Sequence, residues 1–127
     1  MNLEQLESTA KAMAAPGKGI LAADESTPTI GKRFDQINAE STEENRRTYR
    51  DMLFTTEGME NYISGVIFFD ETLRQSTVEE DVPFSKHLSD LGVVPGIKVD
   101  KGAKDLAGFE GEKVTEGLDG LRDGLIE

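Results

Sequence analysis

The chain has 127 residues, a formal net charge of −11 and no cysteine. Its length fits one ordinary domain, and a hydrophobic content of 36% is enough to form a buried core. The acidic balance excludes non-specific nucleic-acid binding, which needs a basic face, and the missing cysteines exclude disulfides, zinc-thiolate sites and cysteine nucleophiles. With His87 as its single histidine, neither a histidine-rich metal site nor a Ser-His-Asp triad is expected.

The sequence carries no sign of export or of membrane insertion. The first residues lack a basic segment followed by an apolar run, so no signal peptide is expected. The longest apolar stretches, such as residues 66–69, are too short to span a bilayer. We therefore expect a cytoplasmic protein with no membrane partner.

The first half of the chain alternates between helical and strand patterns. Apolar residues recur at three- and four-residue intervals over residues 3–14, which predicts an amphipathic helix. Residues 19–23 form a short continuous apolar run, typical of a strand buried on both faces. An N-cap and first-turn acids at residues 41–44 predict a helix that runs to about Phe54.

The second half continues the alternation. A buried strand is predicted over residues 63–69, a helix over 83–91 and a third strand over 94–99. Residues 102–115 are rich in Gly, Lys and Glu and are predicted to form a loop, after which residues 117–126 are predicted to begin another helix. Strands that alternate with helices indicate parallel βα units with right-handed crossovers, which makes the fold class α/β.

Polar residues follow each predicted strand. Residues 24–26 (Asp-Glu-Ser) follow the first strand, residues 70–72 (Asp-Glu-Thr) follow the second, and Lys98, Asp100 and Lys101 lie at the end of the third. The carboxyl ends of parallel strands lie at one edge of the sheet, where loops and helix N-termini converge. The sequence therefore predicts a ligand site at that edge.

The first cluster has two interpretations. A carboxylate at a strand end, here Asp24, can bind or move protons on a polar substrate with help from the hydroxyls of Ser26 and Thr29, and Lys32 and Arg33 could neutralise a phosphate. The other interpretation is helix capping, in which Asp24 or Ser26 accepts hydrogen bonds from free backbone N–H groups.

The other two clusters also leave alternatives open. Lys98 lies between apolar neighbours and shares a strand face with Asp100. A lysine in such a place needs either a carboxylate partner, which could be Asp100 or Asp24, or an anionic ligand. For Asp70 and Glu71, helix capping is the favoured interpretation.

Several helical residues are interpreted without a functional role. His87 falls in a predicted surface helix and is expected to be solvated. In the helix that ends near Phe54, the buried face is expected to contain Tyr49, Met52 and Leu53. Ion pairs are expected along the surface of that helix, between the basic residues Arg46, Arg47 and Arg50 and the acidic residues Glu43 and Glu44.

Several collinear segments together resemble class I fructose-1,6-bisphosphate aldolases. They are KGILAADEST at 18–27, EENRR at 43–47, GVI at 65–67 with ETL at 71–73, GIKVDKG at 96–102 and GLDGL at 117–121. The resemblance covers nearly the whole chain and implies the family's (β/α)8 TIM barrel. This chain would supply about three of the eight βα units, so residues 1–127 would be the N-terminal part of the barrel domain, truncated at its C-terminus.

The resemblance also implies an activity. The family reversibly cleaves fructose 1,6-bisphosphate to dihydroxyacetone phosphate and glyceraldehyde 3-phosphate in glycolysis and gluconeogenesis, and its full-length members are expected to be homotetramers. Class I members use neither a metal nor another cofactor. A lysine forms a Schiff base with the substrate ketone, and the iminium then serves as the electron sink.

Site residues follow from the matched positions. The resemblance makes Asp24 the active-site aspartate, which orients the substrate hydroxyls and the iminium and assists cleavage of the C–C bond. It makes Lys98 the third-strand lysine that contacts substrate. The other substrate-binding candidates are Ser26, Thr29, Arg33, Glu25 and Lys32.

The chain also departs from the family pattern. The resemblance places the Schiff-base lysine and the general acid/base glutamate further along than these 127 residues, and Pro28 stands where many members have glycine. We therefore expect the chain alone to be inactive as an aldolase. The alternative is a non-catalytic fragment that acts by interaction or by complementing the rest of the barrel. An independent small α/β module would need protected sheet edges, and the sequence shows no device for protecting them.

Overall fold

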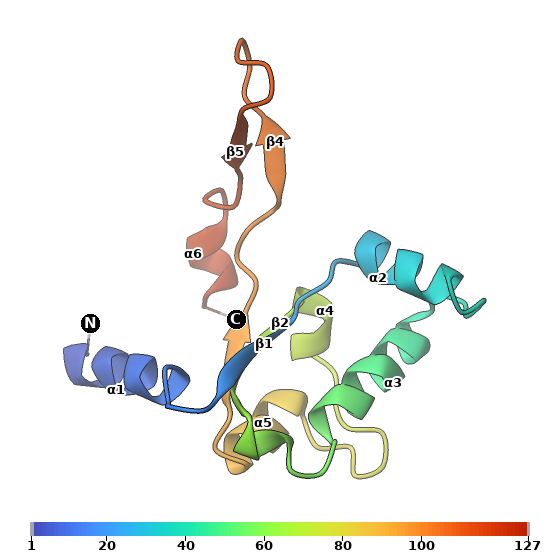
Figure 1. Cartoon of the computed structure of the whole chain (residues 1–127), viewed down its shortest axis with the longest axis vertical. Helices are drawn as coiled ribbons and strands as arrows, with labels where there is room; N and C mark the ends of the chain where they lie inside the picture. Colours follow the sequence, from blue (N-terminus) through green and yellow to red (C-terminus); the bar gives the residue numbers. More distant parts are fainter. Residues whose placement is uncertain (1, 127) are drawn as a thin grey trace. The chain divides into compact units, whose positions relative to one another are not determined.

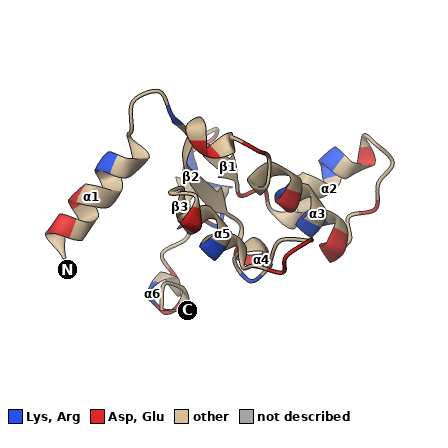
Figure 2. Ribbon diagram, turned by 90° about the horizontal axis from the view of Figure 1, so that it is seen from below, with Lys and Arg blue, Asp and Glu red and all other residues tan. Residues whose placement is uncertain are grey.

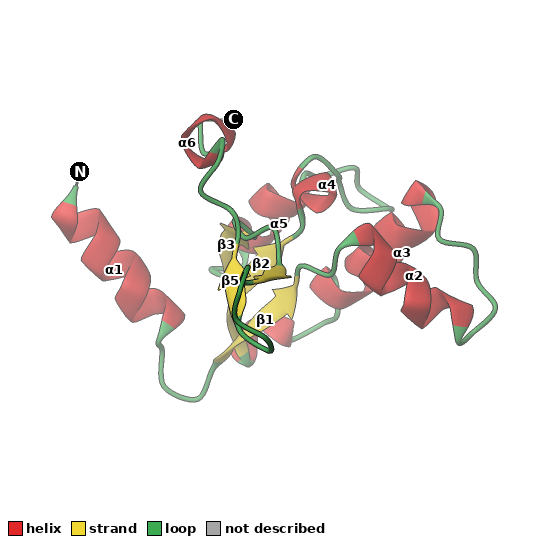
Figure 3. Cartoon of the chain, turned by 90° about the horizontal axis from the view of Figure 1, so that it is seen from above, coloured by secondary structure: helices red, strands yellow, loops and turns green. Residues whose placement is uncertain are grey.

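The computed structural model describes residues 2–126, which divide after Ile97 into two compact units (Figure 1). The first unit contains a parallel sheet of β1 (Gly19–Ala23), β2 (Ile63–Phe68) and β3 (Val94–Ile97), in that order. β2 therefore lies in the centre, and Figure 3 shows the strands with helices around them. The three predicted strands are present, although β2 ends one residue and β3 two residues earlier than predicted. The prediction that the first strand is buried on both faces is wrong, because β1 is an edge strand of this sheet in which only Ala23 is buried and Ile20 is 49% exposed.

Helices connect the neighbouring strands. After α1 (Leu3–Met13), β1 is linked to β2 through α2 (Thr27–Asp35), α3 (Glu43–Phe54) and the short 3-10 helix η1 (Met59–Asn61), and β2 is linked to β3 through α4 (Asp70–Leu73) and α5 (Phe84–Asp90). The predicted helices α1, α3 and α5 are present, whereas α2, η1 and α4 lie in segments for which no helix was predicted.

The start of α3 follows from its sequence. The hydroxyl of Thr42 accepts a hydrogen bond from the backbone N–H of Asn45 (3.1 Å), so it caps one of the free donors of the first turn. Glu43 and Glu44 in that turn complement the positive end of the helix dipole. α2 instead begins with Pro28 in its first turn, where a missing N–H costs nothing.

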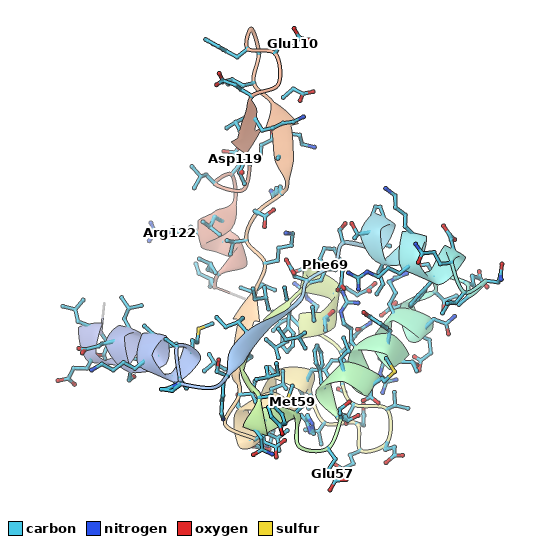
Figure 4. The ribbon with its side chains drawn as sticks, in the orientation of Figure 1. Glu57, Met59, Phe69, Glu110, Asp119 and Arg122 are labelled. Carbon is cyan, nitrogen blue, oxygen red and sulfur yellow. The ribbon has the colours of Figure 1, made fainter. Side chains whose placement is uncertain are left out.

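Three phenylalanine rings form the centre of the core. Phe54 at the end of α3 lies 5.4 Å from Phe68 of β2 and 5.1 Å from Phe84 of α5, measured between ring centroids. All three side chains are fully buried. The rings fix α3 and α5 against the sheet. The other buried residues of this core are Ala23, Met59 (labelled in Figure 4), Val66, Leu88 and Val93.

The buried face of α3 differs from the prediction. Met52 is 57% exposed, and Tyr49 and Leu53 are only half-buried. The two fully buried residues of α3 are Phe54 and a charged one, Arg50.

The second unit contains a β-hairpin in the segment that was predicted to be a loop, so that prediction is wrong. Here β4 (Ala103–Asp105) pairs antiparallel with β5 (Lys113–Thr115), and an ion pair joins Lys113 to Asp105 across the strands. The helical turn α6 (Leu121–Gly124) follows. The Nζ of Lys101 donates a hydrogen bond to the backbone oxygen of Asp119 (3.1 Å), which is labelled in Figure 4.

Among the residues that the structure describes, no helix combines the length and the apolar character needed to cross a bilayer.

Candidate functional site

The carboxyl ends of β1 and β2 lie side by side. Ala23, the last residue of β1, pairs with Phe68, the last residue of β2, in the parallel ladder. Asp24 follows directly after β1, while Phe69, labelled in Figure 4, follows β2 and is the N-cap residue of α4. The predicted polar residues 24–26 and 70–72 therefore leave the sheet at the same edge, as the strand pattern predicted.

Arg50 reaches from α3 to the segment around Asp24. Its side chain is 2% exposed, its Nε donates to the backbone oxygen of Ala23 (2.8 Å), and its Nη2 donates to the backbone oxygen of Glu25 (3.0 Å). Burial lowers the pKa of Arg50, and the negative charge of Glu25 is the largest opposing influence; the charge of the half-buried Asp24 also opposes it. The guanidinium thus holds the backbone on both sides of Asp24.

The side chain of Glu25 lies between two arginines. Its Oε1 is 2.9 Å from Nη1 of Arg33, and its Oε2 is 3.2 Å from Nη2 of Arg50. The second contact is an ion pair without hydrogen-bond alignment, since Oε2 has no hydrogen-bond partner among the described residues. Glu25 is 10% exposed and Arg33 55% exposed, so the carboxylate is covered while the outer guanidinium faces solvent. Figure 2 marks acidic and basic positions on both α2 and α3.

The hydroxyls at the start of α2 face each other. Ser26 is the N-cap residue, as the capping interpretation predicted, but its side chain makes no capping hydrogen bond. Its Oγ lies 3.0 Å from the Oγ1 of Thr29, and its backbone oxygen accepts from the N–H of Thr29 (2.8 Å). Thr29 and Lys32 are exposed on α2.

Lys98 belongs to the second unit and follows β3 in the chain. Its Nζ lies 2.6 Å from Oδ1 of Asp100, while Oδ2 of Asp100 accepts from the backbone N–H of Gly102 (3.0 Å). The hydrogen bond from Lys98 is the main cause that lowers the pKa of the Asp100 carboxyl. Of the two carboxylate partners considered for Lys98, the structure shows Asp100 bound to it.

The arginines of α3 bind distant segments, so the prediction that they pair along their own helix is wrong for Arg46 and Arg50. Arg46 forms a two-point ion pair with Glu71, with distances of 2.7 and 2.5 Å. Arg47 donates to the backbone oxygens of Ser76 (2.8 Å) and Thr77 (2.7 Å), in addition to a 3.4 Å contact with Glu44. Backbone carbonyls outside regular structure need hydrogen-bond donors, and Arg47 supplies them for Ser76 and Thr77.

Lowering the pH is expected to weaken the first unit through Glu71. The hydrogen bonds from Arg46 hold the pKa of the Glu71 carboxyl below its ordinary value of 4.5, so the folded state releases this proton more readily than the unfolded state does. The resulting stabilisation is full above the unfolded pKa and is lost as the pH falls through the lower folded pKa. When the pH is lowered from about 7 to about 3, the free energy of unfolding measured in urea should fall less in Glu71→Gln than in the wild type.

The matched control for that titration is Glu44→Gln. The Glu44 side chain is 66% exposed and lies 3.4 Å from Arg47, so Glu44→Gln should change the pH dependence of unfolding much less than Glu71→Gln does. Equal pH profiles for the wild type and Glu71→Gln would contradict the assigned role of the Arg46–Glu71 pair.

The prediction for His87 is wrong. The residue is half-buried rather than solvated, and its Nε2 lies 3.1 Å from the backbone oxygen of Phe54. α3 ends at Phe54, so this carbonyl has no partner within the helix. His87 therefore has a structural contact at the junction of α3 and α5.

Sequence reasoning missed Arg50 as a residue of the site. The signal that could have found it is the helical period. Arg50 lies four residues after Arg46 and four residues before Phe54, which puts the three on one face of α3. Because Phe54 packs in the core, Arg46 and Arg50 on the same face of α3 also point toward the interior.

Comparison with known proteins agrees with this geometry. The family described as "Fructose-bisphosphate aldolase class-I" matches residues 5–126. A "Probable fructose-bisphosphate aldolase class 1" from Xanthomonas campestris pv. campestris is 62% identical over 127 residues, which are the whole of this chain and 38% of that protein. "Fructose-bisphosphate aldolase 7, cytosolic" from Arabidopsis thaliana is 58% identical over 93% of this chain and 33% of its own length.

The structural comparison gives the same result. A fructose-bisphosphate aldolase from Plasmodium falciparum, solved in complex with TRAP and a small-molecule inhibitor, matches 94% of this chain and 34% of its own chain, with a TM-score of 0.88 and 52% identity. The chain thus spans 38% or less of the length of these relatives. The predicted fold class, the N-terminal part of a (β/α)8 barrel, is confirmed. The chain belongs to the class-I fructose-bisphosphate aldolase family.

Proposed function

We propose that the residues around Asp24, at the carboxyl end of β1, form the first part of the active site of an enzyme. This enzyme would reversibly cleave fructose 1,6-bisphosphate into two triose phosphates. The observation that carries this proposal is the position of Asp24. It follows β1 directly and is half-buried, between two backbone carbonyls that Arg50 holds. A fixed carboxylate at a strand end can orient substrate hydroxyls and accept a proton as a C–C bond breaks.

The start of α2 has the chemistry of a phosphate site. The Ser26 and Thr29 hydroxyls lie 3.0 Å apart at the N-terminus of α2, where the helix dipole favours negative charge. Arg33 is half-exposed, and Lys32 is exposed on the same helix. We assign these four residues to a phosphate group of the substrate. Glu25, held between its two arginines, would act by orienting Arg33.

Lys98 would contribute positive charge and a donor to the bound substrate. Its Nζ is paired with Asp100 at 2.6 Å, and a sugar phosphate would replace one anionic partner by another. The Schiff-base lysine of the family would lie outside these 127 residues. Homotetramer assembly is proposed on the basis of the family alone, and a cytosolic location on the basis of the cytosolic Arabidopsis relative.

A chimera tests the proposal. The 127 residues replace the matching 38% of the Xanthomonas relative, and release of triose phosphates from fructose 1,6-bisphosphate is measured. In parallel, the 127-residue chain is treated with dihydroxyacetone phosphate and borohydride, and its intact mass is determined. We expect an active chimera and no adduct on the chain alone, because the covalent nucleophile is supplied by the other part.

The other results are equally informative. An inactive chimera would overturn the proposed function. A reduced adduct on the 127-residue chain would overturn the claim that the Schiff-base lysine lies outside it, and Lys98 would be the first residue to substitute.

A further inference from the structure

Arg50 contacts the backbone on both sides of one residue. Its Nε binds the carbonyl of Ala23 and its Nη2 the carbonyl of Glu25, so the two acceptors flank Asp24. The two donors belong to one rigid planar guanidinium, which fixes the distance between the two carbonyls. The backbone of Asp24 is therefore held from both ends by a single side chain.

The guanidinium is itself held in place. Its Nη2 lies 3.2 Å from the Glu25 carboxylate, and its Cζ lies 5.6 Å from the centroid of the Tyr49 ring. The Tyr49 hydroxyl accepts from Nη1 of Arg33, which also contacts Glu25. Arg50 thus has partners on its edges and against an aromatic ring, which leaves it little freedom to change conformation.

Burying an arginine on the inner face of a helix costs the free energy of removing its charge from water. An apolar residue of similar size would pack beneath α3 without desolvating a charge, and replacements of this kind are often neutral or stabilising in other proteins. Arg47, on the same helix, binds two carbonyls in the same manner but is less buried, at 23% side-chain exposure against 2% for Arg50. What distinguishes Arg50 is that its two carbonyls flank Asp24.

We propose that Arg50 is a positioning residue for Asp24, and that it fixes the carboxylate for the chemical step by holding the Ala23 and Glu25 carbonyls. The inference rests on the proposed function, because it needs Asp24 to act on substrate. A lysine at position 50 keeps the positive charge but cannot span both carbonyls with a planar fork. The charge is then retained while the geometry is lost.

The test uses Arg50→Lys in the chimera, with Arg47→Lys as the matched control. Active sites are counted by borohydride trapping with dihydroxyacetone phosphate. The changes in kcat per trapped site and in KM, relative to the parent chimera, are then measured separately. A misplaced reacting group lowers the rate of the chemical step by up to about a hundredfold. We therefore expect kcat of Arg50→Lys to fall about ten- to a hundredfold, while KM changes by less than about twofold. Arg47→Lys should change kcat per site by less than about twofold, since its carbonyls are at Ser76 and Thr77.

Each result decides the matter. A merely structural role would reduce the number of trapped sites and leave kcat per site unchanged, which would overturn the inference. Equal losses of kcat in Arg50→Lys and Arg47→Lys would also overturn it. An inactive parent chimera refutes the proposed function itself, whereas an active chimera that is unaffected by Arg50→Lys refutes only the role of Arg50.

Discussion

Replacing Asp24 by asparagine in the chimera is expected to lower kcat for fructose 1,6-bisphosphate cleavage on the order of 10²–10⁴-fold. Asparagine keeps the size and the backbone contacts of the residue, but it can neither accept the substrate proton nor carry the charge that orients an iminium. The start of α2, where we place the phosphate, is unchanged, so KM should move much less than kcat. Steady-state kinetics with borohydride-trapped site counts would measure both.

Asp70→Asn is the matched control for this experiment. Asp70 lies two residues after the end of β2, close to the same edge of the sheet as Asp24. Its side chain is 70% exposed and pairs with Arg74 at 2.8 Å. Its replacement should leave kcat within about twofold of the parent, as expected for an exposed ion pair of little energy. Full activity in Asp24→Asn would refute the catalytic assignment of Asp24.

The largest expected effect on stability comes from Phe54→Ala. The Phe54 ring is fully buried and contacts Phe68 and Phe84, so truncation leaves a cavity between α3, α5 and the sheet. We expect the free energy of unfolding to fall by about 3–5 kcal/mol, which is a large part of the stability of a small domain. Urea unfolding of the 127-residue chain, followed by circular dichroism, would measure the change.

The control lies two residues away on the same helix. Met52 is 57% exposed, so Met52→Ala should change the free energy of unfolding by less than about 0.5 kcal/mol. If the two variants unfolded at the same urea concentration, Phe54 would not lie in the core as described.

The sheet could be predicted because its strands are continuous apolar runs. Residues 19–23 and 63–68 contain one polar side chain, that of Ser64, and acidic residues follow the two runs at Asp24 and Asp70. α2 was missed because its sequence, TPTIGKRFD, has only Ile30 and Phe34 as buried residues, which is too few to show a helical period. The β4–β5 hairpin was missed because strands of three exposed residues carry no alternation to detect.

The site was predictable where topology alone decides it. The sequence placed Asp24 at a strand end, and parallel pairing then fixes the edge at which it lies. The arginines of α3 that bind residues at that edge were not predictable, because charged residues on a helix are normally expected to face solvent. Nothing local to Glu25 or Glu71 indicates that arginines 25 residues away in the chain will bind them.

The contacts of α3 also have a consequence for the order of assembly. Arg46 and Arg47 reach residues that are synthesised 25 to 30 positions later, while Arg50 reaches back by a similar distance. On a ribosome, α3 emerges with the acceptors of Arg50 already available and those of its neighbours still missing. The Arg50 contacts that hold the segment after β1 can therefore form before the Arg46 and Arg47 contacts that hold the segment after β2.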